Sequence, residues 1–164
     1  MNMLLEDKYY FIVRKLIEEN KTISTMESCT GGFIASMITD VPGASNVMKC
    51  SFVTYSNEAK IKQGVPEWVI DKHGVYSKET AYMMAHACAR QYNSNIGIGI
   101  TGCFGSTDPQ NKDGVPGVVD IAIVDGVYSD IWTKAIGPFG SRHDYKIAVA
   151  DFISDELMKY LGIA

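Results

Sequence analysis

The feature that most constrains the fold is a change of hydrophobic period within residues 21–38. Residues 21–26 are rich in β-branched side chains, which favours a short strand. Residues 33–38 place apolar side chains three and four positions apart, which indicates a helix with one buried face. The turn between them, residues 27–32, reads Glu-Ser-Cys-Thr-Gly-Gly. A strand followed at once by a helix predicts a βα unit of an α/β protein.

The 27–32 turn also contains side chains that could carry chemistry. A strand-to-helix turn directs backbone N–H groups and the positive end of the helix dipole at whatever lies above it. Ser28 stands at the mouth of this turn, where a nucleophile could attack beside oxyanion donors near Thr30 and Gly31. A purely structural interpretation, in which Ser28 or Thr30 caps the helix, fits the same residues.

The rest of the chain continues the alternation of strands and helices. Strands are expected at 49–55 and 95–101, and a hairpin at 118–124 and 127–136 around the turn signal Asp125-Gly126. Helices are expected over 5–20, from Ser56 or Asn57, from Pro66, from Ser77, and at the end of the chain. This order predicts one domain, residues 1–164, with an α/β fold: a three-layer α/β/α sandwich around a mixed, partly parallel sheet.

Two further features of the 95–117 region bear on packing and function. Gly97 and Gly99 alternate with isoleucines, and glycine inside a strand marks close approach by another element, here a helix. The segment from residue 101 to 117 has no secondary-structure pattern of its own. Loops of this length are commonly functional.

Composition excludes several classes of function. The 164 residues carry a formal net charge of −4 with no block of Lys and Arg, so no nucleic-acid partner is expected. No apolar run is long enough to span a membrane. The first 21 residues mix charges into their apolar positions, which argues against an export signal. Four widely spaced cysteines then favour reduced thiols and a cytoplasmic location. Three scattered histidines predict no metal site.

Polar residues gather where the predicted strands end. Ser28, the Tyr55-Ser56-Asn57 segment and Thr101-Gly102 each follow a strand, and ligands of α/β sheets collect at such carboxyl ends. A serine nucleophile needs a base, and no histidine lies at these loops. Lys60 falls in the first turn of its helix, where the dipole disfavours a cation and burial would favour the neutral amine further. The Tyr55 hydroxyl could relay a proton. The alternatives are a solvated surface lysine and a core tyrosine.

Six segments in the same order resemble those of the CinA C-terminal domain family, over nearly the whole chain. They are Glu27–Gly32, Pro42–Ser45, Tyr55–Asn57 with Ala59-Lys60, Gly74–Ser77, Ile100–Gly102 and Phe139–Arg142. The Glu-Ser-Cys-Thr-Gly-Gly run followed by Tyr-Ser-Asn-x-Ala-Lys is far more specific than a single glycine motif.

The resemblance implies an activity and a site. Characterised members of the family are nicotinamide-nucleotide amidases, which hydrolyse nicotinamide mononucleotide to nicotinate mononucleotide and ammonia without a metal or cofactor. By this likeness Ser28 is the nucleophile, Lys60 and Tyr55 activate it, and Arg142 holds the phosphate of a small-molecule nucleotide. A homo-oligomer is also implied. The expected substrate-binding residues are Thr30, Gly31, Gly32, Asn57, Thr101, Gly102, Gly105 and Arg142.

The chain departs from the family pattern in the loop after Thr101-Gly102. The family continues with small residues, Gly-Pro and a Gly-rich run, whereas this chain has Cys103-Phe104-Gly105. Phe104 is bulky enough to reshape the mouth of a pocket, and Ser141 replaces the usual Asp before Arg142. Two alternatives therefore stay open: a nucleotide-binding or regulatory module without turnover, and an amidase of the same mechanism for a different carboxamide.

Overall fold

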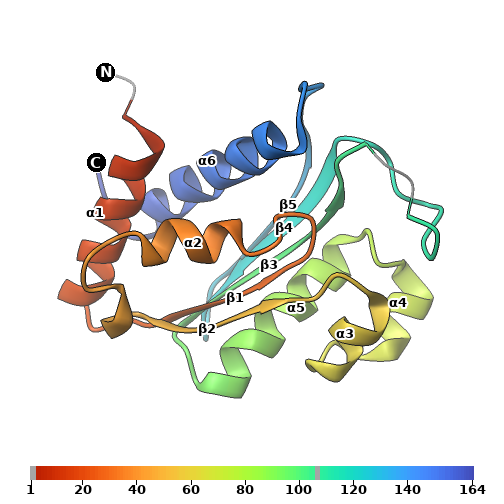
Figure 1. Cartoon of the computed structure of the whole chain (residues 1–164). Coiled ribbons are helices and arrows are strands. Elements are labelled where there is room, and N and C mark those ends of the chain that lie inside the picture. Colours follow the sequence, from red (N-terminus) through yellow and green to blue (C-terminus); the bar gives the residue numbers. More distant parts are fainter. Residues whose placement is uncertain (1–2, 106–107) are drawn as a thin grey trace.

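The computed structural model describes residues 3–105 and 108–164. Residues 106 and 107, which fall in the predicted long loop, lie outside the described residues. Helices cover both faces of one central sheet (Figure 1). This confirms the three-layer α/β/α sandwich. One face carries α1 (Leu5–Glu18), α2 (Phe33–Thr39) and α6 (Arg142–Tyr160), and the other carries α3 (Asn57–Lys62), α4 (Glu67–His73) and α5 (Lys78–Tyr92).

The sheet is mixed, as the sequence predicts. Its five strands lie in the order β2-β1-β3-β4-β5. Strand β1 runs parallel to its neighbours β2 and β3, and the β4–β5 hairpin adds two antiparallel pairings. The carboxyl ends of β1, β2 and β3 therefore share one edge, where the site forms. The strands are β1 (Ile23–Glu27), β2 (Met48–Val53), β3 (Ile96–Cys103), β4 (Val118–Val124) and β5 (Ser129–Ala135).

The second strand ends earlier than predicted. β2 stops at Val53, so Thr54 and Tyr55 belong to the connection into α3. Tyr55 is 64% exposed, which makes the core-tyrosine interpretation wrong. The expected helix starts are confirmed, because the Ser56 hydroxyl accepts from the Ala59 N–H and the Ser77 hydroxyl accepts from the Thr80 N–H. Within the described ranges, no helix is long and apolar enough to cross a membrane.

The two glycines of β3 let α5 lie directly on the sheet. A Cβ atom added at Gly99 would be 2.0 Å from the Ala81 carbonyl oxygen, and one at Gly97 would be 2.1 Å from that of Ala85. Both obstacles are backbone atoms, so a side chain would displace the helix rather than rotate a rotamer. The close helix approach inferred from the Ile-Gly alternation is confirmed.

We therefore expect Gly99→Ala to destabilise the fold by about 3 kcal/mol, at the upper end of the usual cost of overpacking. The measurement is urea denaturation followed by circular dichroism. Gly126→Ala is the matched control, because a Cβ there meets nothing within 4 Å, and we expect its free energy of unfolding to stay within about 0.5 kcal/mol of wild type. A Gly99→Ala protein as stable as the control would contradict this packing.

Candidate active site

The Ser28 turn is held from below by the buried carboxylate of Glu27. Its Oε1 accepts hydrogen bonds from Thr30 Oγ1 at 2.6 Å and the Ile34 N–H at 3.0 Å. Its Oε2 accepts from the Ala35 N–H at 3.0 Å and from Thr25 Oγ1 at 3.3 Å. Glu27 is fully buried at the end of β1. One side chain thus ties the strand, the turn and the first N–H groups of α2 together.

This arrangement decides against the capping interpretation. The N-cap of α2 is Gly32, at φ +93°, and it makes no side-chain cap bond. The Thr30 hydroxyl donates to the Glu27 carboxylate, and the Gly31 N–H donates to the Ser28 carbonyl oxygen at 2.9 Å. The expectation of Gly31 as an oxyanion donor is therefore wrong for this structure. The Ser28 N–H is bonded to the Ile100 carbonyl of β3 at 3.0 Å, which leaves the Ser28 hydroxyl to face outward.

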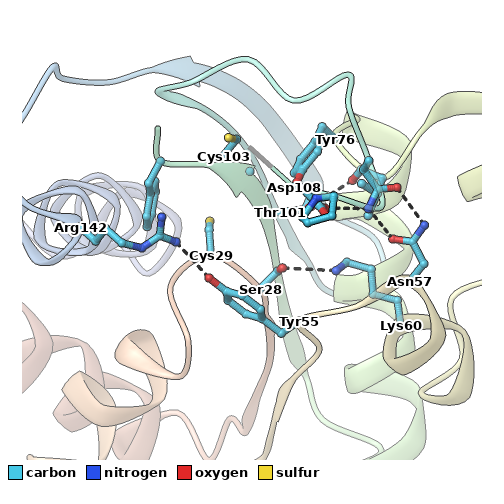
Figure 2. Close-up of a pocket in the computed structure, with 15 residues that line it drawn as sticks. Ser28, Cys29, Tyr55, Asn57, Lys60, Tyr76, Thr101, Cys103, Asp108 and Arg142 are labelled. Carbon is cyan, nitrogen blue, oxygen red and sulfur yellow. Dashed lines mark hydrogen bonds between the residues drawn. The ribbon is translucent and has the colours of Figure 1, made fainter. Parts of the chain in front are cut away.

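Lys60 reaches Ser28 from α3. Its Nζ donates to Ser28 Oγ at 3.3 Å (Figure 2). It also donates to the Thr54 carbonyl oxygen at 2.7 Å. The residue is 2% exposed, so the surface-lysine interpretation is wrong. Desolvation by burial lowers the pKa of Lys60 to about 8, although the nearby Cys29 and Asp108 act in the opposite direction. Of the two causes that the sequence suggested, burial is the one that acts. The expected place in the first turn is wrong, because Lys60 lies in the last turn of the six-residue α3, where a helix dipole would favour a cation.

Arg142 and Tyr55 form the opposite rim. Arg142, the first residue of α6, donates from Nη2 to the Tyr55 hydroxyl at 3.0 Å. Its guanidinium also lies 5.7 Å above the Phe104 ring, which in turn stacks on Tyr145. Phe104 therefore supports Arg142 from beneath. Among the hydrogen bonds of the described residues, none joins Tyr55 to Ser28 or Lys60, so the expected proton relay is not formed here.

The first helical turns of α6 fit closely over the Ser28 turn. A Cβ atom at Gly31 would lie 3.3 Å from Lys146 Nζ, and the Phe33 and His143 rings meet edge to face. Lys146 makes no hydrogen bond or ion pair that is recorded among the described residues. Ser141 caps α6 by accepting from the Asp144 N–H at 3.1 Å, a role that serine and the family's aspartate fill equally well.

These elements enclose a pocket of about 250 Å³. The sequence-predicted residues that line it come from all three strand ends and from α3 and α6. They are Ser28, Tyr55, Asn57, Lys60, Thr101, Gly102 and Arg142. Four predicted substrate contacts are not among its lining: Thr30 turns toward Glu27, Gly31 and Gly32 shape the turn, and Gly105 lies outside.

A second wall of the pocket was not predicted. Asp108, in the long loop, accepts from the Tyr76 hydroxyl and from Asn111 Nδ2, both at 2.8 Å. The side-chain amides of Asn111 and Asn57 form two reciprocal hydrogen bonds of 2.9 Å. The loop is thereby fastened to α3, the helix that carries Lys60. No local sequence signal marks these pairs, because their members lie 32 and 54 positions apart.

Cysteine and metal chemistry find little support in the described part of the chain. Burial, with the Glu27 charge second, raises the pKa of Cys29 to about 12, so this neighbour of Ser28 stays a neutral thiol. None of the four cysteines, all of which lie in the described ranges, forms a disulfide. Among residues 3–105 and 108–164, no group of three or more His, Cys, Asp or Glu side chains could hold a metal ion.

Fold and site together define an α/β protein in which a buried lysine contacts a serine at the carboxyl edge of the sheet. The family model for the CinA C-terminal domain matches residues 6–160. The chain belongs to this family, which confirms the resemblance seen in the sequence.

Similar proteins agree with the family assignment. A CinA-like protein of Fervidobacterium nodosum is 41% identical over 73% of this chain and 30% of its own length. A putative competence-damage inducible protein of Caldicellulosiruptor saccharolyticus is 40% identical over 96% of this chain and 37% of its own length. The chain thus spans about a third of these curated relatives.

Solved structures show the same fold. The competence/damage inducible protein CihA from Agrobacterium tumefaciens has a TM-score of 0.86 at 27% identity and covers 99% of both chains. A CinA superfamily protein from Klebsiella pneumoniae has a TM-score of 0.89 at 22% identity, covering 98% of this chain and 99% of its own. At 22% identity, the likeness to the Klebsiella pneumoniae protein supports a shared fold only.

The burial of the Lys60 amine leads to a prediction about the free energy of unfolding. Lys60→Met removes the cost of burying a cation and loses the bond to Thr54, so we expect a net gain of about 2 kcal/mol in the free energy of unfolding at pH 7. The gain is full below pH 8, where both states of wild type bind the proton, and shrinks as the pH rises toward the ordinary lysine value of 10.5.

Chemical denaturation at several pH values measures this effect. Lys62→Met is the control, because Lys62 lies in the same helix with a side chain that is 72% exposed; its effect should stay within about 0.5 kcal/mol and show no such pH dependence. A destabilised Lys60→Met protein at pH 7 would contradict the assigned desolvation.

Proposed function

We propose that this protein is an amidohydrolase that deamidates nicotinamide mononucleotide to nicotinate mononucleotide and ammonia, with Ser28 as nucleophile. The observation that carries the proposal is the bond between Ser28 Oγ and a fully desolvated Lys60 whose pKa is lowered to about 8. A serine hydroxyl requires such a base, and serine–lysine pairs serve this purpose in acyl transfer.

The hydrogen bond to Thr54 orients the base. When Lys60 is neutral, one N–H donates to the Thr54 carbonyl at 2.7 Å, and the lone pair turns to accept the Ser28 proton. Ser28 Oγ then attacks the carboxamide carbon and forms a tetrahedral oxyanion. The protonated Lys60 returns the proton to the amide nitrogen, the C–N bond breaks, and ammonia leaves. Lys60 next takes a proton from water, whose oxygen attacks the acyl carbon. Lys60 then gives this proton to Ser28 Oγ as the ester C–O bond breaks, and the product leaves as the carboxylate.

The oxyanion needs donors from the Ser28 turn. The Gly31 N–H donates to the Ser28 carbonyl oxygen within the turn. The N–H groups of Cys29 and Thr30 interact with the Cys29 thiol and lower its pKa, against the larger effect of burial. We assign these two N–H groups to the oxyanion, because both belong to the segment that Glu27 fixes.

The nucleotide phosphate is assigned to the cations of α6. Arg142 lines the pocket and offers a planar fork of donors, and Lys146 stands one turn further along the same helix, above Gly31. In this arrangement Tyr55 orients Arg142 by accepting its Nη2 hydrogen bond. Tyr55 thus acts on the substrate through Arg142, and a role in activating Ser28 would require its hydroxyl to move.

The first test is ammonia release from nicotinamide mononucleotide by the wild-type protein. We expect Ser28→Ala to lower kcat by about a thousandfold or more, since loss of a nucleophile leaves only binding and oxyanion stabilisation. Ser36→Ala is the matched control, because Ser36 lies exposed on α2 outside the pocket. Full turnover by Ser28→Ala would eliminate the assigned nucleophile.

The same assay separates the two alternatives. Binding of the mononucleotide in a calorimeter without ammonia release identifies a regulatory module. Ammonia release from other amides in a panel, but not from nicotinamide mononucleotide, identifies an amidase for a different carboxamide. The loop that carries Phe104 and Asp108 is the part of the pocket that would cause such a change of substrate.

The pKa of Lys60 predicts the pH dependence of the reaction. The base is active when neutral, so kcat should fall with decreasing pH below about 8, with a limiting slope of about tenfold per pH unit. A pH series of kcat at saturating substrate measures this limb. A rate that stays constant between pH 6 and pH 8 would exclude Lys60 as the general base.

A further inference from the structure

We propose that Asp108 determines substrate specificity by placing a fixed negative charge against the cationic pyridinium ring of the substrate. This inference rests on the proposed function and deepens it, since it concerns what distinguishes the oxidised, charged mononucleotide from a neutral carboxamide of the same shape. The residue was not predicted from the sequence.

The charges of the pocket are arranged on two sides of the nucleophile. Figure 2 shows Arg142 on one side of Ser28 and Asp108 on the other, with the Ser28–Lys60 bond between them. Asp108 is the single carboxylate among the described residues that line the pocket. Such a site complements a ligand that carries an anion at one end and a cation near its carboxamide.

The Asp108 carboxylate is held in place by donors on three residues. Its Oδ2 accepts from Tyr76 and Asn111, both at 2.8 Å, and its Oδ1 accepts from the Gln110 N–H at 2.9 Å. Burial alone would raise the pKa of Asp108, but these hydrogen bonds outweigh it and lower the pKa, so the group stays ionised. A charge that is fixed before the ligand arrives costs no reorganisation on binding.

The field of Asp108 already reaches the reacting groups. Asp108 lines the same pocket as Ser28 and Lys60, and its charge raises the pKa of Lys60 against the stronger effect of burial. A carboxamide attached to a pyridinium ring brings a positive charge next to Lys60 and within reach of Arg142. Without a compensating carboxylate, these like charges would repel the substrate ring.

The test compares two ligands that differ in ring charge. Nicotinamide mononucleotide has a cationic ring, whereas its reduced form has a neutral dihydropyridine ring with the same carboxamide, ribose and phosphate. Dissociation constants are measured by calorimetry in a Ser28→Ala background, where turnover does not interfere. We expect Ser28→Ala to bind the oxidised form about tenfold or more tightly than the reduced form, as expected for one nearby charge in a partly desolvated site.

In the Ser28→Ala/Asp108→Asn protein, we expect this preference to fall to about twofold or less, mainly through weaker binding of the oxidised form. Because each protein is compared with itself on two ligands that share the same phosphate, a change in phosphate contacts affects both constants alike. An unchanged preference would overturn the proposal, as would equal losses for both ligands, which would mean that Asp108 only holds the loop.

Two controls separate charge from loop structure. Tyr76→Phe removes one hydrogen bond to Asp108 but keeps its charge, so the preference should persist. Asp113→Asn removes a charge from the same loop at an exposed position that does not line the pocket, and it should also leave the preference intact. Loss of the preference in either control would overturn the proposal. Failure of the proposed function is seen separately, as absence of ammonia release by wild-type protein.

Discussion

The hydrogen bonds of the Glu27 carboxylate are the interaction on which the site depends. Its two oxygens bind two threonine hydroxyls and two backbone N–H groups of α2. A buried carboxylate is tolerated only when it is satisfied in this way. The result is a turn with no side-chain N-cap, in which Ser28 is left to the pocket. Stability and reactivity of the turn therefore come from one group that never touches the pocket.

The burial of Lys60, unlike the hydrogen bonds of Glu27, favours reactivity at the expense of stability. Its burial beside Ser28 costs stability, because a cation is placed where little water reaches it. The same desolvation lowers its pKa toward neutrality, which is what a general base requires. The structure compensates part of this cost with two hydrogen bonds from the amine, to the Thr54 carbonyl oxygen and to the Ser28 hydroxyl. We take this combination as the physical basis of the proposed acyl transfer.

The pocket is completed by contacts between distant segments. The Asn57–Asn111 amide pair and the Tyr76–Asp108 bond fasten the long loop to the wall that carries Lys60. On the other side, Phe104 packs between Tyr145 and the guanidinium of Arg142. The residue that departs most from the family pattern thus has a defined structural role. Loop and α6 together give the pocket its two opposite charges.

Much of the fold could be predicted because its determinants are local. Ser56 and Ser77 cap their helices as expected, and the Ile-Gly alternation of β3 correctly indicated a closely packed helix. The association of Ser28 with Lys60 also followed, from their positions at neighbouring strand ends. Whether Lys60 is buried could not be predicted, since burial depends on packing that a helix pattern cannot report, and its expected place in the first turn of α3 was wrong.

The parts that sequence reasoning missed depend on long-range pairing or on where one side chain turns. Thr30 looked like a ligand contact, but its hydroxyl is satisfied by Glu27. Asp108 and Asn111 sit in a loop without periodicity, so nothing in their neighbourhood indicated that they would meet Tyr76 and Asn57. Polar networks of this kind become visible only when the chain is folded.

The most direct test of the central claim, that a desolvated Lys60 serves as the base for Ser28, is an NMR titration of the Lys60 side chain in the free protein, with the exposed Lys62 as internal reference. The account predicts a pKa of about 8 for Lys60, well below that of Lys62. A Lys60 pKa near the ordinary lysine value of 10.5 would contradict it, because the amine would then stay protonated at neutral pH.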